Sequence, residues 1–316
     1  MRARALASAA ALASVLLLAA CGGSGAGRGR EAAGRTRATT PAPGSIAALL
    51  ERPGPTVSAI PGTEDYASGP TRVSFLLIDG QGRTVDRPRA RVWVARSDDA
   101  PPFLHTTAVL EQIGAAGSSE PASGELAHIY VARFSVPRPG IYTLVVEPVG
   151  GRRVQAELHI QVRARPQAPA VGSKAIASDT PTIRSAHGDL ARLTTRVPPD
   201  RALLRYSVAE SLAAHAPFVL VFATPKFCTS RTCGPVVDVV DAVRRRFAGT
   251  AIRFIHVEIY KRNNPALGEN RWVKQWHLPT EPWIFLVGRD GRIKARFEGS
   301  VSVGELAEAV RRSLAG

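Results

Sequence analysis

Two cysteines separated by four residues, Cys228 and Cys233, are the residues of this sequence whose types and spacing point most directly to chemistry. An apolar run, 218–222, precedes them, and a run with helical periodicity, 236–247, follows them. The first turn of a helix presents N–H groups without intrahelical partners and the positive end of the helix dipole. Both stabilise a thiolate relative to a thiol, and the thiolate is the nucleophile. The pattern therefore indicates a redox-active thiol pair between a buried strand and a helix N-terminus.

The N-terminal residues resemble a bacterial lipoprotein signal. Two arginines, Arg2 and Arg4, precede an apolar run over 5–20, which is shorter than the roughly 20 residues of a membrane-spanning helix. The run ends in Leu18-Ala19-Ala20-Cys21, which resembles the lipobox, where the cysteine is diacylated and becomes the first residue of the mature chain. The resemblance implies lipidation at Cys21, an anchor in the bacterial cell membrane and an extracytoplasmic location. Cys228 and Cys233 are then the only two thiols in an oxidising compartment, which favours their pairing with each other.

The composition is that of a globular protein, and it excludes several classes of function. The chain has 316 residues, of which 45% are hydrophobic, and this length suits about two domains. Its formal net charge of +15 favours attraction to anionic surfaces, but no basic cluster interleaved with aromatic residues predicts nucleic-acid binding. No phosphate-binding loop, serine-hydrolase motif or metalloprotease motif is present. We expect no cofactor, no metal and no nucleic-acid partner.

The patterning divides the chain into a signal peptide (1–20), a flexible tether (21–55), a β domain (56–165), a linker (166–200) and an α/β domain (201–316). The β domain has short alternating segments separated by Gly and Pro turns, which predict an all-β, immunoglobulin-like sandwich. Its strands are expected at 72–79, 90–95, 129–136, 141–147 and 154–162. Its histidines, His105, His128 and His159, are too dispersed to predict a metal site.

The region 201–316 alternates strand-like and helix-like segments, which predicts a small α/β domain with a mixed sheet. Capping-box patterns at Ser207 to Glu210 and Ser302 to Glu305 predict two helix starts. Helices are expected at 207–215, 235–247, 270–276 and 302–314, and strands at 218–223, 252–259, 283–287 and 293–297.

This order of elements resembles the thioredoxin fold, and two local motifs add to the resemblance. Cys233-Gly234-Pro235-Val236 resembles the Cys-Gly-Pro-Cys of thioredoxins, with valine in place of the second cysteine. Thr280-Glu281-Pro282, followed by an apolar strand and an Asp-Gly turn, resembles the cis-proline loop of membrane-anchored, TlpA-like thiol oxidoreductases. The resemblance implies a thioredoxin-like domain over 201–316 in which Pro282 packs beside the cysteines and shapes the groove for a partner chain.

The same resemblance implies roles for individual residues. Cys233, at the expected helix start, resembles the attacking cysteine, and Cys228 would resolve the mixed disulfide. The buried acid of thioredoxins is missing, because Val221 stands about where it would be, and Glu281 is the candidate substitute. The basic residues that flank the thiols are Lys226 and Arg231. Three tryptophans could line the groove, and at least two of them are expected to pack in the core: Trp272, Trp276 and Trp283. The expected partners are protein thiols and disulfides.

Four alternatives to the oxidoreductase stay open at this point. The segment Cys228 to Gly234 also resembles Q-type peroxiredoxins, in which Cys228 would attack peroxide and Cys233 would resolve the product. Thioredoxin-fold copper chaperones pair two cysteines with a later histidine, for which His277 is the nearby candidate. The pair could also be an inert disulfide, or the protein a binding lipoprotein that has lost catalysis.

Overall fold

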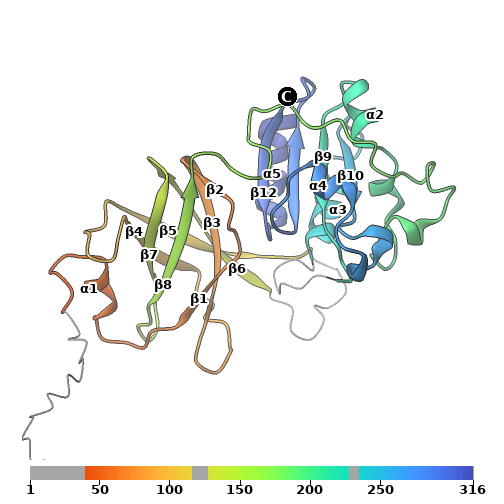
Figure 1. Cartoon of the computed structure of the whole chain (residues 1–316). Coiled ribbons are helices and arrows are strands. Elements are labelled where there is room, and N and C mark those ends of the chain that lie inside the picture. The colour runs from red at the N-terminus through yellow and green to blue at the C-terminus, as the bar shows by residue number, and fades with distance from the viewer. Residues whose placement is uncertain (1–39, 116–126, 228–234, 316) are drawn as a thin grey trace, which may run out of the picture. The chain divides into compact units, whose positions relative to one another are not determined.

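Two β-sheets organise the part of the chain that the structure, a computed structural model, describes: residues 40–115, 127–227 and 235–315 (Figure 1). The described residues from Pro41 onward belong to one compact unit. Cys21, Cys228, Arg231 and Cys233 lie outside the described residues, as does the predicted signal peptide. Within the described ranges, no helix has the length and apolar character needed to cross a membrane.

The first sheet has eight strands, which lie in the order β1-β3-β6-β5-β4-β7-β8-β2. Every neighbouring pair is antiparallel except β2 and β8. Thr56, just before β1, and Gln155, just before β8, form an isolated bridge, so the sheet curls until its two sides approach each other. The strands are β1 (Ser58–Pro61), β2 (Tyr66–Ala67), β3 (Gly69–Ile78), β4 (Arg89–Ala95), β5 (Leu104–Gln112), β6 (His128–Val136), β7 (Gly140–Pro148) and β8 (Ala156–Arg163).

The inner face of this curled sheet carries one large apolar core. Alternate residues of the strands point to the same face, so Val73, Phe75 and Leu77 of β3 enter the core together. The rings of Phe75 and Tyr130 stack there, with their centroids 5.4 Å apart. A short helix, α1 (Ala47–Leu50), follows Ile46, which belongs to a smaller apolar cluster with residues of β4 and β7.

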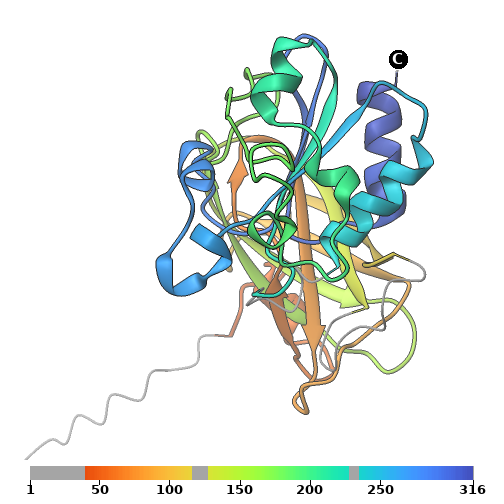
Figure 2. The same cartoon turned by 90° about the vertical axis from the view of Figure 1, so that its right-hand side faces the viewer.

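The second sheet has four strands, β9 (Phe218–Phe222), β10 (Arg253–Val257), β11 (Trp283–Val287) and β12 (Ile293–Glu298). They lie in the order β10-β9-β11-β12, with β9 and β10 parallel and the other pairs antiparallel. The helix α3 (Val236–Arg246) connects β9 with β10, and α5 (Val303–Leu314) follows β12. The two helices lie side by side and share one apolar core with the sheet (Figure 2).

Short helical segments and an aromatic core cover the rest of the second sheet. Trp276, Phe222 and Phe285 pack ring against ring, with Trp283 stacked on Phe285. Trp276 and Trp283 are therefore core residues, whereas Trp272 is half-buried. The remaining segments are the α-helices α2 (Val208–Ala213) and α4 (Arg271–Gln275) and the 3-10 helices η1 (Leu190–Arg192), η2 (Arg201–Leu204), η3 (Lys261–Asn263) and η4 (Pro265–Leu267).

The segment 166–200, expected as a linker, lies partly along the second sheet. Backbone N–H groups of Gly172 and Ala175 donate to the carbonyls of Ile293 and Gly291 at 2.8 Å, and Ile293 donates back to Ser173 at 2.9 Å. These contacts add an irregular chain beside β12. They satisfy backbone groups that an edge strand would otherwise leave open.

The predicted fold class, an α/β thioredoxin-like domain with an immunoglobulin-like sandwich, was wrong. The described chain is mostly β, with an eight-stranded curled half-barrel sheet, a four-stranded sheet and few helices. Period-two alternation identifies strands that bury one face, but a single curled sheet and two stacked sheets bury such faces equally well. In the C-terminal region, α2 and α4 have only 6 and 5 residues. Helices therefore cover less of the four-stranded sheet than an α/β fold requires.

Local predictions that depend on neighbouring residues were more accurate. The capping box at α2 is confirmed, because Ser207 and Glu210 each bond the other's backbone N–H. At α5 only half of the box forms: the Ser302 hydroxyl accepts from the Glu305 N–H at 3.0 Å. The Glu305 carboxylate instead pairs with Arg72 and Arg133 of the eight-stranded sheet.

Buried charged groups also join the two sheets. The Asp65 carboxylate accepts hydrogen bonds from the backbone N–H groups of Gln167 and Ala168 and pairs with Arg296 of β12 at 3.0 Å. The Glu298 carboxylate accepts from the N–H groups of Glu64 and Asp65 at 2.9 and 2.8 Å. Buried carboxylates thereby hold together segments that are far apart in the sequence.

Candidate functional site: an acidic edge of the four-stranded sheet

Three segments meet at one edge of the four-stranded sheet. Phe222 of β9 is paired with both Val257 of β10 and Trp283 of β11. The residues after β9, the residues after β10 and the residues before β11 therefore emerge at the same edge. Phe227, the last described residue before the cysteine segment, belongs to the first of these stretches. We call Glu258, Tyr260 and Glu281, which lie here, the acidic edge.

Glu258 is a buried carboxylate connected to the chain just before Cys228. Glu258 is 5% exposed. Its Oε1 accepts hydrogen bonds from the N–H of Thr195 and, at 2.9 Å, from the Thr195 hydroxyl. The same hydroxyl accepts from the N–H of Lys226 at 3.1 Å. Within the described part of the chain, Glu258 Oε2 has no hydrogen-bond partner. A buried acid with an open acceptor is unusual, because desolvation is costly when it is not offset by a hydrogen bond.

Glu281 is the second acid of this edge, and its surroundings favour the protonated form. The Tyr260 hydroxyl donates to Glu281 Oε1 at 3.1 Å. Burial raises the pKa of Glu281 above its ordinary value, the hydrogen bond from Tyr260 opposes this, and the charges of Glu258 and Glu269 add to the rise. The peptide bond between Glu281 and Pro282 is cis.

His256 holds the end of β9 in place. It is 2% exposed, and its Nε2 lies 3.0 Å from the carbonyl oxygen of Ala223. Burial lowers the pKa of His256, so the ring is neutral at pH 7 and the nitrogen that faces the carbonyl carries the proton. Its role is to donate this hydrogen bond and to fix Ala223, five residues before Cys228.

The structure brings together some of the residues that the sequence singled out. Glu281 and Pro282 lie at this edge, whereas the positions of Cys228 and Cys233 fall outside the described residues. Val221 is buried in the sheet between His256 and Ile284, so it offers no acid there. Lys226 is exposed, with its ammonium 5.5 Å from the centre of the Phe227 ring. His277 is exposed and belongs to no cluster of metal-ligating groups in the described ranges.

Glu258 is the residue that sequence reasoning missed. Its only signal is a carboxylate near the end of the strand expected at 252–259; in the structure β10 ends at Val257, so Glu258 emerges directly after it. Its partner Thr195 lies 63 positions earlier in a segment expected to be a linker. No local pattern predicts that contact.

An open cavity of about 840 Å³ adjoins the acidic edge. Glu258 and Tyr260 contribute to its wall, and Trp272 offers an aromatic surface. Its other charged lining residues are Arg192, Lys261, Arg262 and Arg271. The excess of positive charge suits an anionic ligand or an acidic segment of a partner chain.

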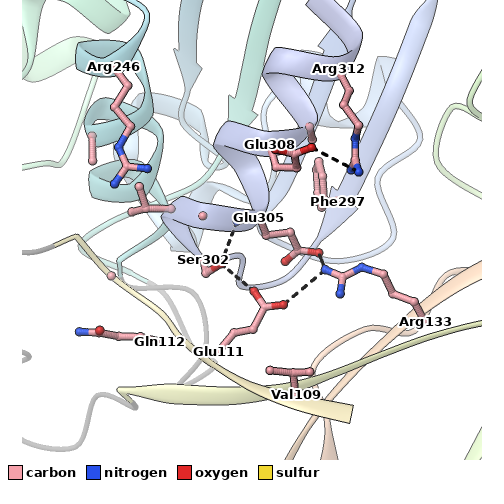
Figure 3. Close-up of a pocket in the computed structure, with 15 residues that line it drawn as sticks. Val109, Glu111, Gln112, Arg133, Arg246, Phe297, Ser302, Glu305, Glu308 and Arg312 are labelled. Atoms are coloured by element: carbon pink, nitrogen blue, oxygen red, sulfur yellow. Dashed lines mark hydrogen bonds and ion pairs between the residues drawn. The ribbon is translucent and has the colours of Figure 1, made fainter. Parts of the chain in front are cut away.

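A second cavity, of about 910 Å³, lies between β5, α3 and α5 (Figure 3). Its carboxylates already have partners: Glu111 accepts from the Ser302 hydroxyl at 2.6 Å and pairs with Arg133 at 3.4 Å, as the dashed lines show. Glu305 is paired with Arg72 and Arg133, which lower its pKa against the opposing effect of burial. These groups are occupied in holding the two sheets together, so this cavity is a weaker candidate than the acidic edge.

Comparison with known proteins adds little to this geometry. No protein-family model matches the sequence. No curated protein matches it either. One solved structure with a detectable likeness is that of astrotactin-2, described as a conserved vertebrate-specific and perforin-like membrane protein involved in neuronal development. The identity is 19%, the TM-score is 0.22, and the match covers 35% of this chain and 22% of that chain. A TM-score this low carries no argument, so function must be argued from the site.

Proposed function

We propose that this protein is a membrane-anchored, extracytoplasmic thiol–disulfide oxidoreductase that acts on protein thiols and disulfides through Cys228 and Cys233. The observation that carries the proposal is the buried Glu258. One of its oxygens is connected through Thr195 to the backbone of Lys226, two residues before Cys228, and the other has no partner in the described chain. This proposal rests on the thiol pair and its acidic neighbours and not on a fold class.

Thiol exchange needs a group that takes and returns a proton, because only the thiolate attacks a disulfide. Glu281 suits this task, since burial holds its pKa above the ordinary range of a carboxyl and nearer to the pH at which exchange occurs. Glu258 adds a second carboxylate, whose charge favours the proton on Glu281. The acidic edge thus supplies the proton acceptor that Val221 does not.

The exchange itself transfers two electrons in two steps. The thiolate of Cys233 attacks a disulfide of the partner, so that a mixed disulfide forms and one partner sulfur leaves as a thiolate. The thiolate of Cys228 then attacks Cys233 Sγ, which closes a disulfide within this chain and releases the second partner sulfur. The partner is reduced and the pair is oxidised, and the reverse sequence oxidises a partner dithiol.

The test is a titration of the purified chain against glutathione buffers of known potential, with the disulfide measured by thiol alkylation and mass spectrometry. A reduction potential above about −300 mV is expected, because structural disulfides are typically more negative than this. A much lower potential would identify an inert bridge and refute the proposal.

Single-cysteine variants separate the roles of the two thiols. Cys228→Ser should accumulate a mixed disulfide with a partner, because the attacking thiol is retained and the resolving thiol is lost. Cys233→Ser should not. The opposite result, together with rapid peroxide consumption by the wild-type chain, would replace thiol exchange with a peroxidase.

The proposed anchor is tested at Cys21. A Cys21→Ser variant should shift the protein from the membrane fraction to the soluble extracytoplasmic fraction, because stable anchoring depends on buried acyl chains. Mass spectrometry of the wild-type N-terminal peptide should show a diacylated cysteine. A chain that stays in the membrane fraction after this substitution would contradict the proposed anchor.

A further inference from the structure

Three side chains with metal-ligating groups converge on the eight-stranded sheet, far along the sequence from the cysteines. Glu157 and His159 are two residues apart on β8, so their side chains leave the same face of the strand. The register pairs His159 with Thr143 of β7, and Thr143 with Ala95 at the end of β4. Asp98, in the turn that follows β4, is thereby brought to His159 from 61 positions earlier.

The distances within this cluster suit a shared metal ion better than direct hydrogen bonds. His159 Nε2 lies 3.5 Å from Asp98 Oδ1 and 3.7 Å from Glu157 Oε1. Nitrogen–oxygen hydrogen bonds are about 2.7–3.2 Å long. Ligands about 2.1 Å from one tetrahedral ion are roughly 3.4 Å from each other. The three donor atoms all lie within 4.8 Å of one another, so small side-chain rotations would close such a set around an ion.

The groups around the cluster orient the Asp98 carboxylate but do not neutralise the charges of Asp98 and Glu157. The Thr143 hydroxyl donates to Asp98 Oδ1 at 2.7 Å, and the Asp98 carbonyl accepts from the N–H of Ala47 at 3.1 Å. Partners of this kind direct ligating carboxylates in metal sites. Neither Asp98 nor Glu157 forms an ion pair with a lysine or arginine of the described chain.

We propose that Asp98, Glu157 and His159 form a surface site for a divalent transition-metal ion of the zinc type. One imidazole and two carboxylates are a donor set that suits zinc, whereas calcium and magnesium prefer oxygen ligands alone. The side chains of Asp98, His159 and Glu157 are 57%, 51% and 35% exposed, so solvent reaches the ion and supplies the remaining ligand. The site is independent of the proposed thiol chemistry.

The test is a calorimetric titration of Zn²⁺ into the full chain carrying Cys228→Ser and Cys233→Ser, which removes competing thiols. One ion per chain is expected to bind. In this background His159→Lys should weaken binding by about tenfold or more, because it replaces the imidazole nitrogen with an ammonium group that has no lone pair for a metal ion.

The chain contains a matched control on the same sheet. His128 Nδ1 and Asp86 Oδ2 lie 3.0 Å apart, and no third metal-ligating group of the described ranges joins this pair. His128→Lys should leave the zinc affinity unchanged, and circular dichroism should confirm that both variants fold. The proposal is overturned if the parent chain binds no zinc, if His159→Lys binds as tightly as the parent, or if His128→Lys weakens binding equally.

Discussion

The two acids of the acidic edge differ in what surrounds each carboxylate. Glu258 is almost fully buried and accepts two hydrogen bonds from Thr195 at one oxygen only. Glu281 is half-buried, accepts from Tyr260, and is held toward its neutral form by burial and by the charge of Glu258. A pair of carboxyl groups in unequal surroundings can divide the tasks of holding and accepting a proton.

Glu258→Gln tests the support that Glu258 gives to proton transfer at Glu281. The amide keeps the shape and still accepts from Thr195 at its oxygen, but it removes the negative charge that favours the proton on Glu281. We expect the rate of disulfide exchange with a protein substrate to fall by about tenfold, because Glu281 then takes up the proton less readily. The reduction potential of the pair should change little. Glu269→Gln, which removes an exposed charge nearby, is the matched control, and an equal loss of rate in both variants would argue against this role.

Glu281→Gln should change how stability depends on pH. Burial raises the pKa of Glu281 in the folded protein above the ordinary 4.5, so between those two values the folded state binds more protons than the unfolded chain. The free energy of unfolding from this group therefore falls as pH rises through that window. The variant should lack this fall and be more stable than the wild type at pH 7, by less than about 1 kcal/mol because water screens a half-exposed group. Urea denaturation at several pH values measures this, and a steeper fall in the variant would contradict it.

At the scale of elements, the start of α5 joins helix capping to contacts between sheets. The Ser302 hydroxyl accepts from the Glu305 N–H and donates to Glu111 of β5 at 2.6 Å. Glu305, which would complete the capping box, pairs with Arg72 and Arg133 instead. Ion pairs with arginine stabilise the Glu305 carboxylate more than a hydrogen bond from the Ser302 backbone N–H would, because hydrogen bonds between ionised groups are about twice as strong as neutral ones.

Ser302→Ala should therefore cost more than the loss of an ordinary cap. Loss of an N-cap side chain costs about 1 kcal/mol, and the unpaired Glu111 oxygen adds to this, so we expect about 1–2 kcal/mol in the free energy of unfolding. Ser313→Ala, in the last turn of the same helix, makes the same chemical change and should lie within about 0.5 kcal/mol of the wild type. Guanidinium denaturation compares the two, and equal effects would refute the proposed role of Ser302.

At the scale of the whole described molecule, a few buried polar groups connect the two sheets. The Asp65 carboxylate has no exposed surface and contacts the segment after β8 as well as Arg296 of β12. The Glu298 carboxylate joins the 64–65 turn to Thr280, whose hydroxyl donates to it at 2.6 Å. Thr280 directly precedes the Glu281–Pro282 pair, so the eight-stranded sheet supports the loop that carries one acid of the acidic edge.

Asp65→Ala should destabilise the chain strongly. It leaves the guanidinium of Arg296 without its carboxylate partner and two backbone N–H groups without their acceptor, and breaking a buried pair from one side costs about 3–5 kcal/mol. Asp179→Ala removes a carboxylate that pairs with Arg271 on the surface, where both groups are well exposed, and should cost less than about 1 kcal/mol. Thermal and urea unfolding test the difference. Comparable costs for the two variants would show that the buried pair does not hold the sheets together.

The sequence by itself determined the local elements of this protein. The strand 283–287, the helix that follows Pro235, the cap at Ser207 and the burial of two of the three tryptophans agree with the structure. Turn residues, caps and apolar periodicity act between residues that are close in the chain, so their effects can be read from a short window of sequence. Glu281 was singled out in the same way, from the motif around it, and its role stays a prediction.

Only the tertiary structure decided how those elements combine. The alternation of apolar and polar residues left open whether the strands of 56–165 form two stacked sheets or one curled sheet. Pairing between strands that are distant in the sequence produces one curled sheet. The contact of Glu258 with Thr195 spans 63 positions, and that of His159 with Asp98 spans 61. Such contacts depend on strand order and register, which arise from burial over the whole sheet, so no local pattern of residues contains them.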